Sequence, residues 1–281
     1  MNNNWYKKEK PLLGLTGLGG GVDGLAVVGA AAKTYVDDVF STYLYKGTNG
    51  ANTVNTGLDM DGEGGLTWIK SRTSGSTDHT LFDTARGVNK KLRTDTNEAE
   101  STISANQTFT STGFTLNNTY TDINDHNVWY SSWNFRKAPG FFDVVTWTGD
   151  GTNRILSHSL GCNPGCIILK KTSAADNWVV YHRSNTDTPQ NVALFLNTNG
   201  TTSTGSAYWN NTAPTSTQFT VSQWQNETDD TYVAYLFAGG ASTAATARGV
   251  RFDGSDDYLS LGASSDFDMG TGDFTIECWL N

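Results

Sequence analysis

The sequence predicts an all-β protein with two tandem β-sandwich repeats of the jelly-roll type. Its 281 residues are 12% aromatic and only 17% charged. Much of the remaining composition consists of Thr, which fits a pleated strand, and of Asn, Ser and Gly, which favour turns. Short apolar runs alternate with turns that contain Gly, Asn or Pro, a spacing typical of sandwiches. A long internal repeat is the third observation that points to this class.

The internal repeat has a period of about 100 residues and runs from about residue 44 to residue 240. Each copy has a glycine-containing turn followed by an apolar strand that ends in lysine. Five pairs of segments match in the same order: 45–50 with 147–152, 64–70 with 164–170, 79–83 with 178–182, 112–116 with 217–221, and 128–135 with 232–237. Because the order and the offset are both kept, we infer a duplicated module.

The repeat and the composition together divide the chain into five regions. These are a Gly-rich N-terminal arm (1–33), the first repeat (34–138), the second repeat (139–240), a linker of small residues (241–249) and the first strands of a further sandwich (250–281). Pro139 and Gly140 mark the joint between the repeats. Since a sandwich needs about 100 residues, we expect the last region to be the truncated start of a domain in a longer polypeptide.

Two stretches within the first repeat need separate comment. Residues 34–46 are dense in β-branched and aromatic side chains, and either a short helix or a strand fits them. Residues 85–95 favour a loop or a strand over a helix. Helix signals are otherwise nearly absent from the chain.

Charge and hydropathy exclude several classes of protein. The net charge of −9 argues against a general nucleic-acid binder, which needs a basic footprint. No run of about 18 apolar residues is present, so we expect no membrane insertion. Glycines at 17 and 19–21 and Asp23 interrupt the apolar core that a signal peptide would need.

The cysteines and acidic residues predict no metal site and no cofactor. Cys162 and Cys166 flank a Pro-Gly turn, which leaves a disulfide or half a metal site open, but no second pair has zinc-ligand spacing. Cys278 fits a core position in an alternating strand. Residues 59–63 resemble part of a calcium loop without its terminal Glu, so a turn with solvated acids is the preferred interpretation. Four further aspartates could bind an ion or form Asx-turns: Asp122, Asp125, Asp229 and Asp230.

No catalytic residue is predicted, and we expect the protein not to be an enzyme. The four histidines show no metalloprotease spacing, and no serine stands in a nucleophile elbow. We expect His79, His126, His158 and His182 to be ordinary strand or turn residues.

The nine tryptophans and the N-terminal arm supply the candidate binding residues. Five tryptophans stand in strand patterns and are expected in the core: Trp68, Trp129, Trp133, Trp147 and Trp178. Trp209 and Trp224 lie among Asn, Thr and Gln, which suits an exposed ring that stacks on a sugar or meets a subunit. The arm is too Gly-rich to fold alone. Five of its residues could become ordered against a partner: Trp5, Tyr6, Leu12, Leu13 and Leu15.

Two segments near the C-terminus resemble the opening strands of a concanavalin A-like, laminin G-like domain. These are residues 252–261 and 273–280. The resemblance implies a jelly-roll sandwich of a kind that often binds glycans. The ligand loops of that family lie later in the domain, so no binding residue is carried over.

Most of the chain is similar to a tandem β-domain of tail-fibre and other virion proteins from marine bacteriophages, especially those that infect cyanobacteria. The segments that carry this resemblance are 38–45, 62–70, 83–87 and 139–142. It implies a structural virion protein, made in the host cytoplasm and located on the tail. The chain would be the N-terminal part of a fibre, commonly a homotrimer, whose arm docks on adaptor or nozzle proteins.

The β-modules would then project toward host surface polysaccharide, which the distal part of the fibre would contact. The resemblance supplies no catalytic residue. Two alternatives stay open: a capsid decoration or lectin-like adhesion protein, and a polysaccharide depolymerase that uses two carboxylates.

Overall fold

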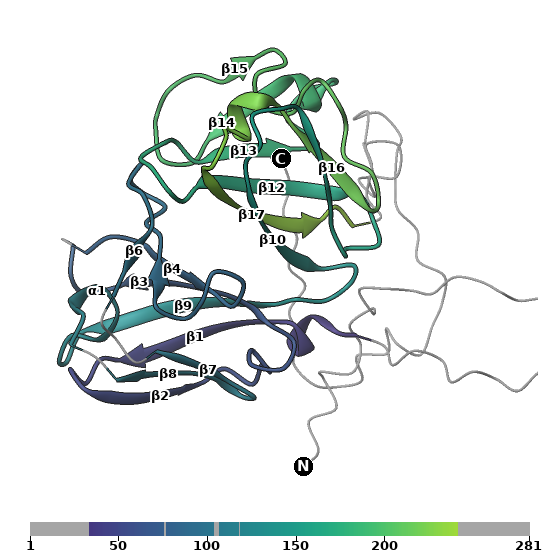
Figure 1. Ribbon diagram of the computed structural model, residues 1–281. Helices are drawn as coiled ribbons and strands as arrows, with labels where there is room; N and C mark the ends of the chain where they lie inside the picture. Colours follow the sequence, from purple (N-terminus) through teal and green to yellow (C-terminus); the bar gives the residue numbers. More distant parts are fainter. Residues whose placement is uncertain (1–33, 76, 104–106, 118, 241–281) are drawn as a thin grey trace, which may run out of the picture. The chain divides into compact units, whose positions relative to one another are not determined.

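The computed structural model describes residues 34–240, except residues 76, 104–106 and 118 (Figure 1). The described chain is made of antiparallel sheets packed as sandwiches, which confirms the predicted all-β class. The arm, the linker and the laminin G-like segment lie outside the described residues, as do Trp5, Tyr6, Leu12, Leu13, Leu15 and Cys278. None of the helices in the described part has the length and apolar character needed to cross a membrane.

The first repeat consists of two facing sheets. The larger has the order β1–β9–β3–β4, with β1 Phe40–Lys46, β9 Trp129–Arg136, β3 Gly65–Ser71 and β4 Thr80–Asp83. The smaller has the order β2–β8–β7, with β2 Ala51–Asn55, β8 Gly113–Asn117 and β7 Thr108–Thr110. Figure 1 shows the smaller sheet lying along one side of the larger. A short ribbon pairs β5 (Lys90–Lys91) with β6 (Ser101–Thr102).

The second repeat has the same plan with a wider main sheet. Its order is β10–β17–β12–β13–β14–β15, with β10 Phe142–Thr148, β17 Thr231–Ala238, β12 Pro164–Lys171, β13 Val179–His182, β14 Val192–Phe195 and β15 Ser203–Thr204. The facing sheet pairs β11 (Arg154–Ser157) with β16 (Gln218–Val221).

The helical elements of the described chain are short. They are η2 Val36–Asp38, α1 Thr121–Asn124, η3 Pro189–Asn191 and η4 Gln223–Gln225. Residues 34–46 therefore hold both a helical turn and a strand, since η2 leads directly into β1. Residues 85–95 form turns around the two-residue strand β5, as expected.

The two repeats match in strand register as well as in strand order. Trp68 pairs with Trp133 in the first main sheet, and Ile168 pairs with Tyr235 in the second. Local hydrogen bonds are repeated too: the Tyr130 hydroxyl accepts from the backbone N–H of Asp125, and the Tyr232 hydroxyl accepts from that of Glu227. These matches relate each position in one repeat to a position in the other.

Each repeat has its own core between its two sheets. In the first repeat, Tyr45, Ile69 and Tyr130 from the main sheet meet Val54 and Phe114 from the smaller sheet. In the second repeat, residues of the main sheet pack on Leu156, Phe219 and Val221. Every one of these side chains alternates with an outward-facing neighbour, as the period of a strand requires.

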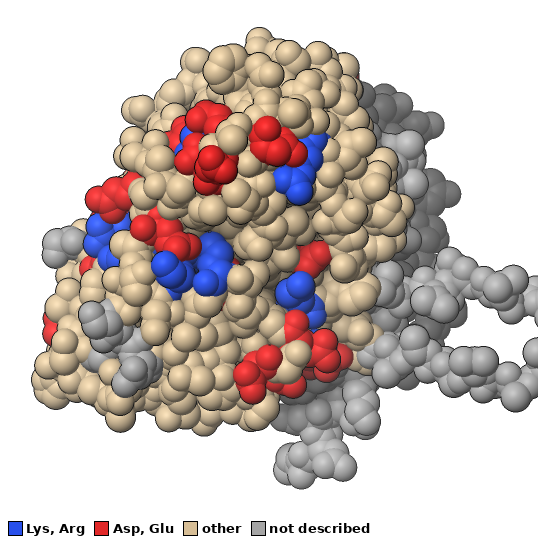
Figure 2. Space-filling view, viewed as in Figure 1, with Lys and Arg blue, Asp and Glu red and all other residues tan. Residues whose placement is uncertain are grey.

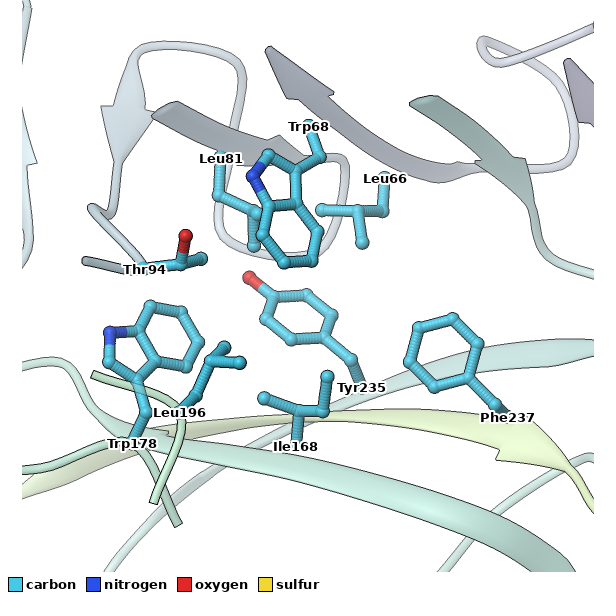
Figure 3. A pocket seen from close by; sticks show the side chains of 9 residues that line it. All are labelled: Leu66, Trp68, Leu81, Thr94, Ile168, Trp178, Leu196, Tyr235 and Phe237. Atoms are coloured by element: carbon cyan, nitrogen blue, oxygen red, sulfur yellow. The ribbon is translucent and has the colours of Figure 1, made fainter. Parts of the chain in front are cut away.

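A third core lies between the repeats, where the outer faces of the two main sheets pack together. The first repeat contributes Leu66, Leu81 and Leu92, and the second contributes Phe142, Val144, Trp178, Val233 and Tyr235. This explains why all four residues of β4 are buried, since that strand has a core on each face. Figure 3 shows side chains from both repeats converging in this layer.

Hydrogen bonds cross the same boundary. The indole N–H of Trp178 donates to the carbonyl oxygen of Arg93 at 2.8 Å. Backbone N–H groups of Glu100 and Asp176 donate to the carbonyl oxygens of Thr172 and Asn97, each at 2.8 Å. The contact between the repeats is therefore directional as well as apolar.

Candidate functional site

The five tryptophans expected in the core have three different environments. Trp147 and Trp178 are buried, as expected. Trp68 and Trp133 are half-buried, and Trp129 is 44% exposed, so the core expectation is wrong for Trp129. Trp68, Trp129 and Trp133 all stand on the outer face of the first main sheet, at the positions that the second repeat does not fully cover.

Trp209 is a clear correction to the sequence analysis. The expectation of an exposed ring is wrong, because Trp209 is 1% exposed and lies in the core of the second repeat. Its indole N–H donates to the Val192 carbonyl oxygen at 3.1 Å, and its ring meets Tyr181 edge-on with centroids 5.8 Å apart. A ring held in this way has no free face for a sugar, so Trp209 is removed from the candidate binding residues.

Trp224 differs from Trp209 although their sequence surroundings are alike. It stands on η4 with 60% of its surface exposed. The backbone N–H of the neighbouring Gln223 donates to the side chain of Asn153, so an amide is fixed beside the helical turn. Its proposed binding role stays a prediction.

An open pocket of about 330 Å³ lies on the outer face of the first main sheet. The described residues that line it are Trp68, His79, Trp133 and Phe135. The rings of Trp68 and Trp133 meet edge-on at 6.2 Å, and those of Trp68 and His79 at 5.8 Å. The pocket walls are therefore aromatic and fixed by ring-to-ring packing.

Two polar atoms of this pocket bind each other. The indole N–H of Trp68 donates to Nδ1 of His79 at 2.9 Å, which requires the neutral imidazole with its proton on Nε2. Burial lowers the pKa of His79, although the nearby Asp95 carboxylate acts in the opposite direction. The imidazole is thus kept neutral near pH 7, and the pocket suits an apolar guest better than a charged one.

Leu44 and Trp129 extend this pocket into a larger apolar surface. Leu44 pairs with Ser131, which stands between Trp129 and Trp133 on the same face of β9. Leu44 is 54% exposed and Trp129 is 44% exposed. We name this surface the aromatic face; its residues are Leu44, Trp68, His79, Trp129, Trp133 and Phe135.

The sequence analysis missed the aromatic face because it assigned these tryptophans to the core. The usable signal was segment 65–69, in which Leu66 and Trp68 make the outer face apolar while Ile69 makes the inner face apolar. Such a pattern indicates a strand that is covered on both sides. Which part of the outer face stays open depends on how the two repeats pack.

The acidic candidates are occupied by local partners. Asp122 pairs with Arg93 at 3.2 Å, and Asp230 pairs with Lys171 at 2.9 Å. Asp59 accepts from the Gly62 backbone N–H at 2.9 Å, which gives the turn that was preferred over a calcium loop. No group of three metal-ligating side chains occurs among the described residues.

Asp125 and Asp229 belong to turns before the closing strands. A carboxylate oxygen of Asp125 accepts from the backbone N–H of His126, and Asp229 has a φ of 64°. Cys162 and Cys166 are free thiols, so the disulfide that their spacing left open is not formed. Of the remaining histidines, His182 ends β13, whereas His126 and His158 lie outside strands.

The charged side chains form small mixed clusters and no large field of one sign on the visible face. Figure 2 shows acidic and basic groups side by side, separated by wide uncharged areas. One cluster joins Arg93 to Asp78, Glu98 and Asp122, and another joins Lys171 to Glu227 and Asp230. This surface offers no basic track for a nucleic-acid backbone.

Comparisons with known proteins bear on the repeats alone. Neither a search of curated proteins nor a search of solved structures found a significant match. A family model described as a domain of unknown function (DUF7483) matches residues 36–247, which include every described strand. The chain therefore belongs to the DUF7483 family, and the matched residues cover both β-sandwich repeats described here.

Proposed function

We propose that the protein is a structural virion protein, the N-terminal part of a phage tail fibre. Residues 34–240 would act as a spacer, and the arm would dock on tail proteins through Trp5, Tyr6, Leu12, Leu13 and Leu15. The distal part would reach host surface polysaccharide, and the fibre would be a homotrimer made in the host cytoplasm. The observation that carries the proposal is the shared core between the two repeats.

A shared core is what a spacer needs. Two modules joined only by a linker would keep polar outer sheet faces and move independently. Here the outer faces carry buried Leu66, Leu81 and Tyr235, and the connection from β9 to β10 is short. Arg86 is also buried at this boundary, where it pairs with Asp83 at 2.6 Å and with Glu100 at 3.0 Å. Separating the repeats would expose apolar surface and break the hydrogen bond from the Tyr235 hydroxyl to Asp83, which lies in the same charged cluster.

The experiment is an electron cryo-microscopy map of the intact particle, followed by a binding assay. We expect density for the repeats at the tail, with residues 1–33 wedged between tail subunits. Chain that lacks residues 1–33 should fail to bind particles without fibres, whereas chain that lacks residues 250–281 should still bind. Density on the capsid shell, or binding that survives loss of the arm, would contradict the fibre proposal and favour a decoration protein.

A lectin-like adhesion function is the second candidate, and the exposure of Trp224 favours it. Asn124 and Asn226 are equivalent, because their side-chain amides donate to the equivalent backbone carbonyls of Gly50 and Thr152. Two positions earlier, the first repeat has Asp122 where the second repeat has Trp224. The fold therefore does not require a tryptophan there. Sugar stacking needs such an exposed ring beside amide groups.

Fluorescence titration with host surface polysaccharide tests this second candidate. Trp224→Ala should abolish binding, and Ile155→Ala should leave it unchanged, because Ile155 is about equally exposed but lies on β11. Equal binding by both variants would exclude the Trp224 site. Release of reducing sugar during the titration would favour the depolymerase alternative.

A further inference from the structure

The contact between the repeats has a covering side and a covered side. The first repeat supplies the covering strip, with Leu66 on β3, Leu81 on β4 and Leu92 beyond β5. The second repeat supplies the covered face, where Ile168, Trp178, Tyr235 and Phe237 line the layer under that strip (Figure 3).

The covered face of the second repeat has an open counterpart in the first. The strand registers relate Ile168 to Trp68 and Tyr235 to Trp133, because each pair faces across equivalent strands. The same registers relate Phe237 to Phe135 and Trp178 to His79. These four counterparts are the residues that line the open pocket of about 330 Å³. The site is thus filled in the second repeat. In the first repeat, Trp68 and Phe135 touch the edge of the internal contact, and the pocket between the four residues stays open.

The covering strip also has a counterpart. Leu66 corresponds to Cys166, and Leu81 corresponds to Val180. Leu92 pairs with Leu81 through an isolated β-bridge, and Leu194 likewise pairs with Val180 in the second repeat. Leu92 and Leu194 therefore correspond as well. Cys166, Val180 and Leu194 are all partly exposed on the outer face of the second main sheet. The second repeat therefore carries its own apolar strip, defined here as Cys166, Val180 and Leu194.

Exposed positions next to the pocket differ between the repeats in a way that the fold does not require. Register equates Leu44 with Thr146 and Trp129 with Thr231, and all four residues are exposed. The second repeat folds with two threonines at these solvent-facing positions. The first repeat exposes a leucine and a tryptophan there instead, which adds apolar surface beside the open pocket.

The chemistry of the pocket decides the kind of guest. Sugar rings need several hydrogen-bonding groups at the pocket wall, but the wall of this pocket is almost wholly apolar, and the Trp68 indole N–H is already bound to Nδ1 of His79. An apolar side chain needs none. The contact between the two repeats shows that apolar side chains fit such a site, because leucine side chains fill the equivalent space in the second repeat.

The geometry points to a second copy of this chain as the occupant of the aromatic face. The apolar strip of one copy would pack on the aromatic face of the next, which repeats between chains the contact already made within each chain. Such a contact joins two different surfaces, so it is heterologous and builds a closed ring or an open filament. Burial raises the pKa of the Cys166 thiol to about 11, so this residue stays an uncharged packing group at neutral pH. The inference does not depend on where the protein is located.

Sedimentation velocity of the purified full chain over a range of concentrations tests the contact. We expect wild-type chain to associate reversibly. The variant L44T/W129T carries the residues of the second repeat at these positions, and its association should be weaker by about tenfold or more. Ile155→Thr is the matched control, since Ile155 is 63% exposed on β11 and should have no effect. Wild-type chain that stays monomeric, or association unchanged in L44T/W129T, would overturn the proposal.

A mixing experiment distinguishes a heterologous contact from a symmetric one. V180T/L194Q breaks the apolar strip and keeps the aromatic face, whereas L44T/W129T does the reverse. At a concentration where wild-type chain associates, each variant alone should stay mostly monomeric, and an equimolar mixture should form a one-to-one heterodimer that grows no further. Thermal unfolding checks that both variants are folded. A mixture that stays monomeric would refute the head-to-tail contact, and it would leave the binding of the arm to particles untouched.

Discussion

Tyr235 donates a hydrogen bond from its hydroxyl to a carboxylate oxygen of Asp83, 2.6 Å away, although 152 positions separate the two residues in the chain. Both side chains are almost completely buried. The same carboxylate accepts from Nε of Arg86, also at 2.6 Å. A polar network thus lies inside the apolar layer between the repeats, where an unpaired group would be costly.

Tyr235→Phe should lower the free energy of unfolding by about 1–3 kcal/mol, because Asp83 loses a buried hydrogen bond without gaining water. Urea denaturation followed by circular dichroism measures the change. Tyr43→Phe is the control, and its effect should stay within about 0.5 kcal/mol because this tyrosine is exposed. Equal effects in both variants would mean that the network contributes nothing to stability.

Trp209→Ala should destabilise the chain by about 3–5 kcal/mol, since it leaves a cavity in the core and removes the donor to Val192. Trp224→Ala should change stability by less than about 0.5 kcal/mol, because the ring is in solvent. Guanidinium denaturation of the two variants under identical conditions makes the comparison. A larger loss in Trp224→Ala would contradict the placement of these rings.

Lys170→Met should remove a rise in stability between pH 8 and pH 10. Burial lowers the pKa of Lys170 from 10.5 to about 8, while its ammonium donates to the Lys171 carbonyl oxygen at 2.7 Å. Between these two pKa values the unfolded chain binds more protons than the folded chain, so stability increases with pH. The contribution is about 2 kcal/mol over this range.

Urea denaturation at several pH values checks the Lys170 prediction. The wild-type chain should gain stability relative to Lys170→Met as the pH rises from 8 to 10. A difference between the two proteins that does not change with pH would show that Lys170 keeps its ordinary pKa.

Gly149→Ala should cost about 2 kcal/mol or more, since a Cβ atom there would lie 2.0 Å from the carbonyl oxygen of Glu227. The equivalent Gly47 has the same constraint, with the Asp125 carbonyl oxygen at 2.1 Å. Gly50→Ala is the control, because nothing lies within 4 Å of its added Cβ. Thermal unfolding of the three alanine variants measures the losses. Equal losses of stability in all three would contradict the predicted steric clash at Gly149 and Gly47.

Strand alternation was enough to predict the fold class, but it did not show which face of each strand points inward. Tyr130, Ser132 and Asn134 alternate with Trp129, Ser131 and Trp133, and the first set faces inward. Whether the side chains of the outer set are buried or exposed could not be predicted from this pattern. Burial of Tyr235 and exposure of Trp129 depend on how one folded repeat packs on the other, which local periodicity does not encode.

The two amide-flanked tryptophans illustrate a second limit. The neighbours of Trp209 and Trp224 are of the same polar kinds, and composition alone treats them alike. The structure separates them through a carbonyl oxygen 17 positions earlier in the chain, which accepts from the Trp209 indole. Polar neighbours in the sequence therefore do not predict whether a tryptophan ring is exposed, because the large side chain can extend into the core and bind a distant backbone carbonyl.

The placement of the first and last strands has a mechanical consequence. Among the described strands, β1 pairs with β9 alone and stands at the edge of its sheet, whereas β17 lies between β10 and β12 and is bonded to both. A pulling force applied to the two ends of residues 34–240 would thus meet one row of backbone hydrogen bonds at β1 and two rows at β17. Under tension the described chain should open from its N-terminal side, while the strand that leads toward the linker stays in place.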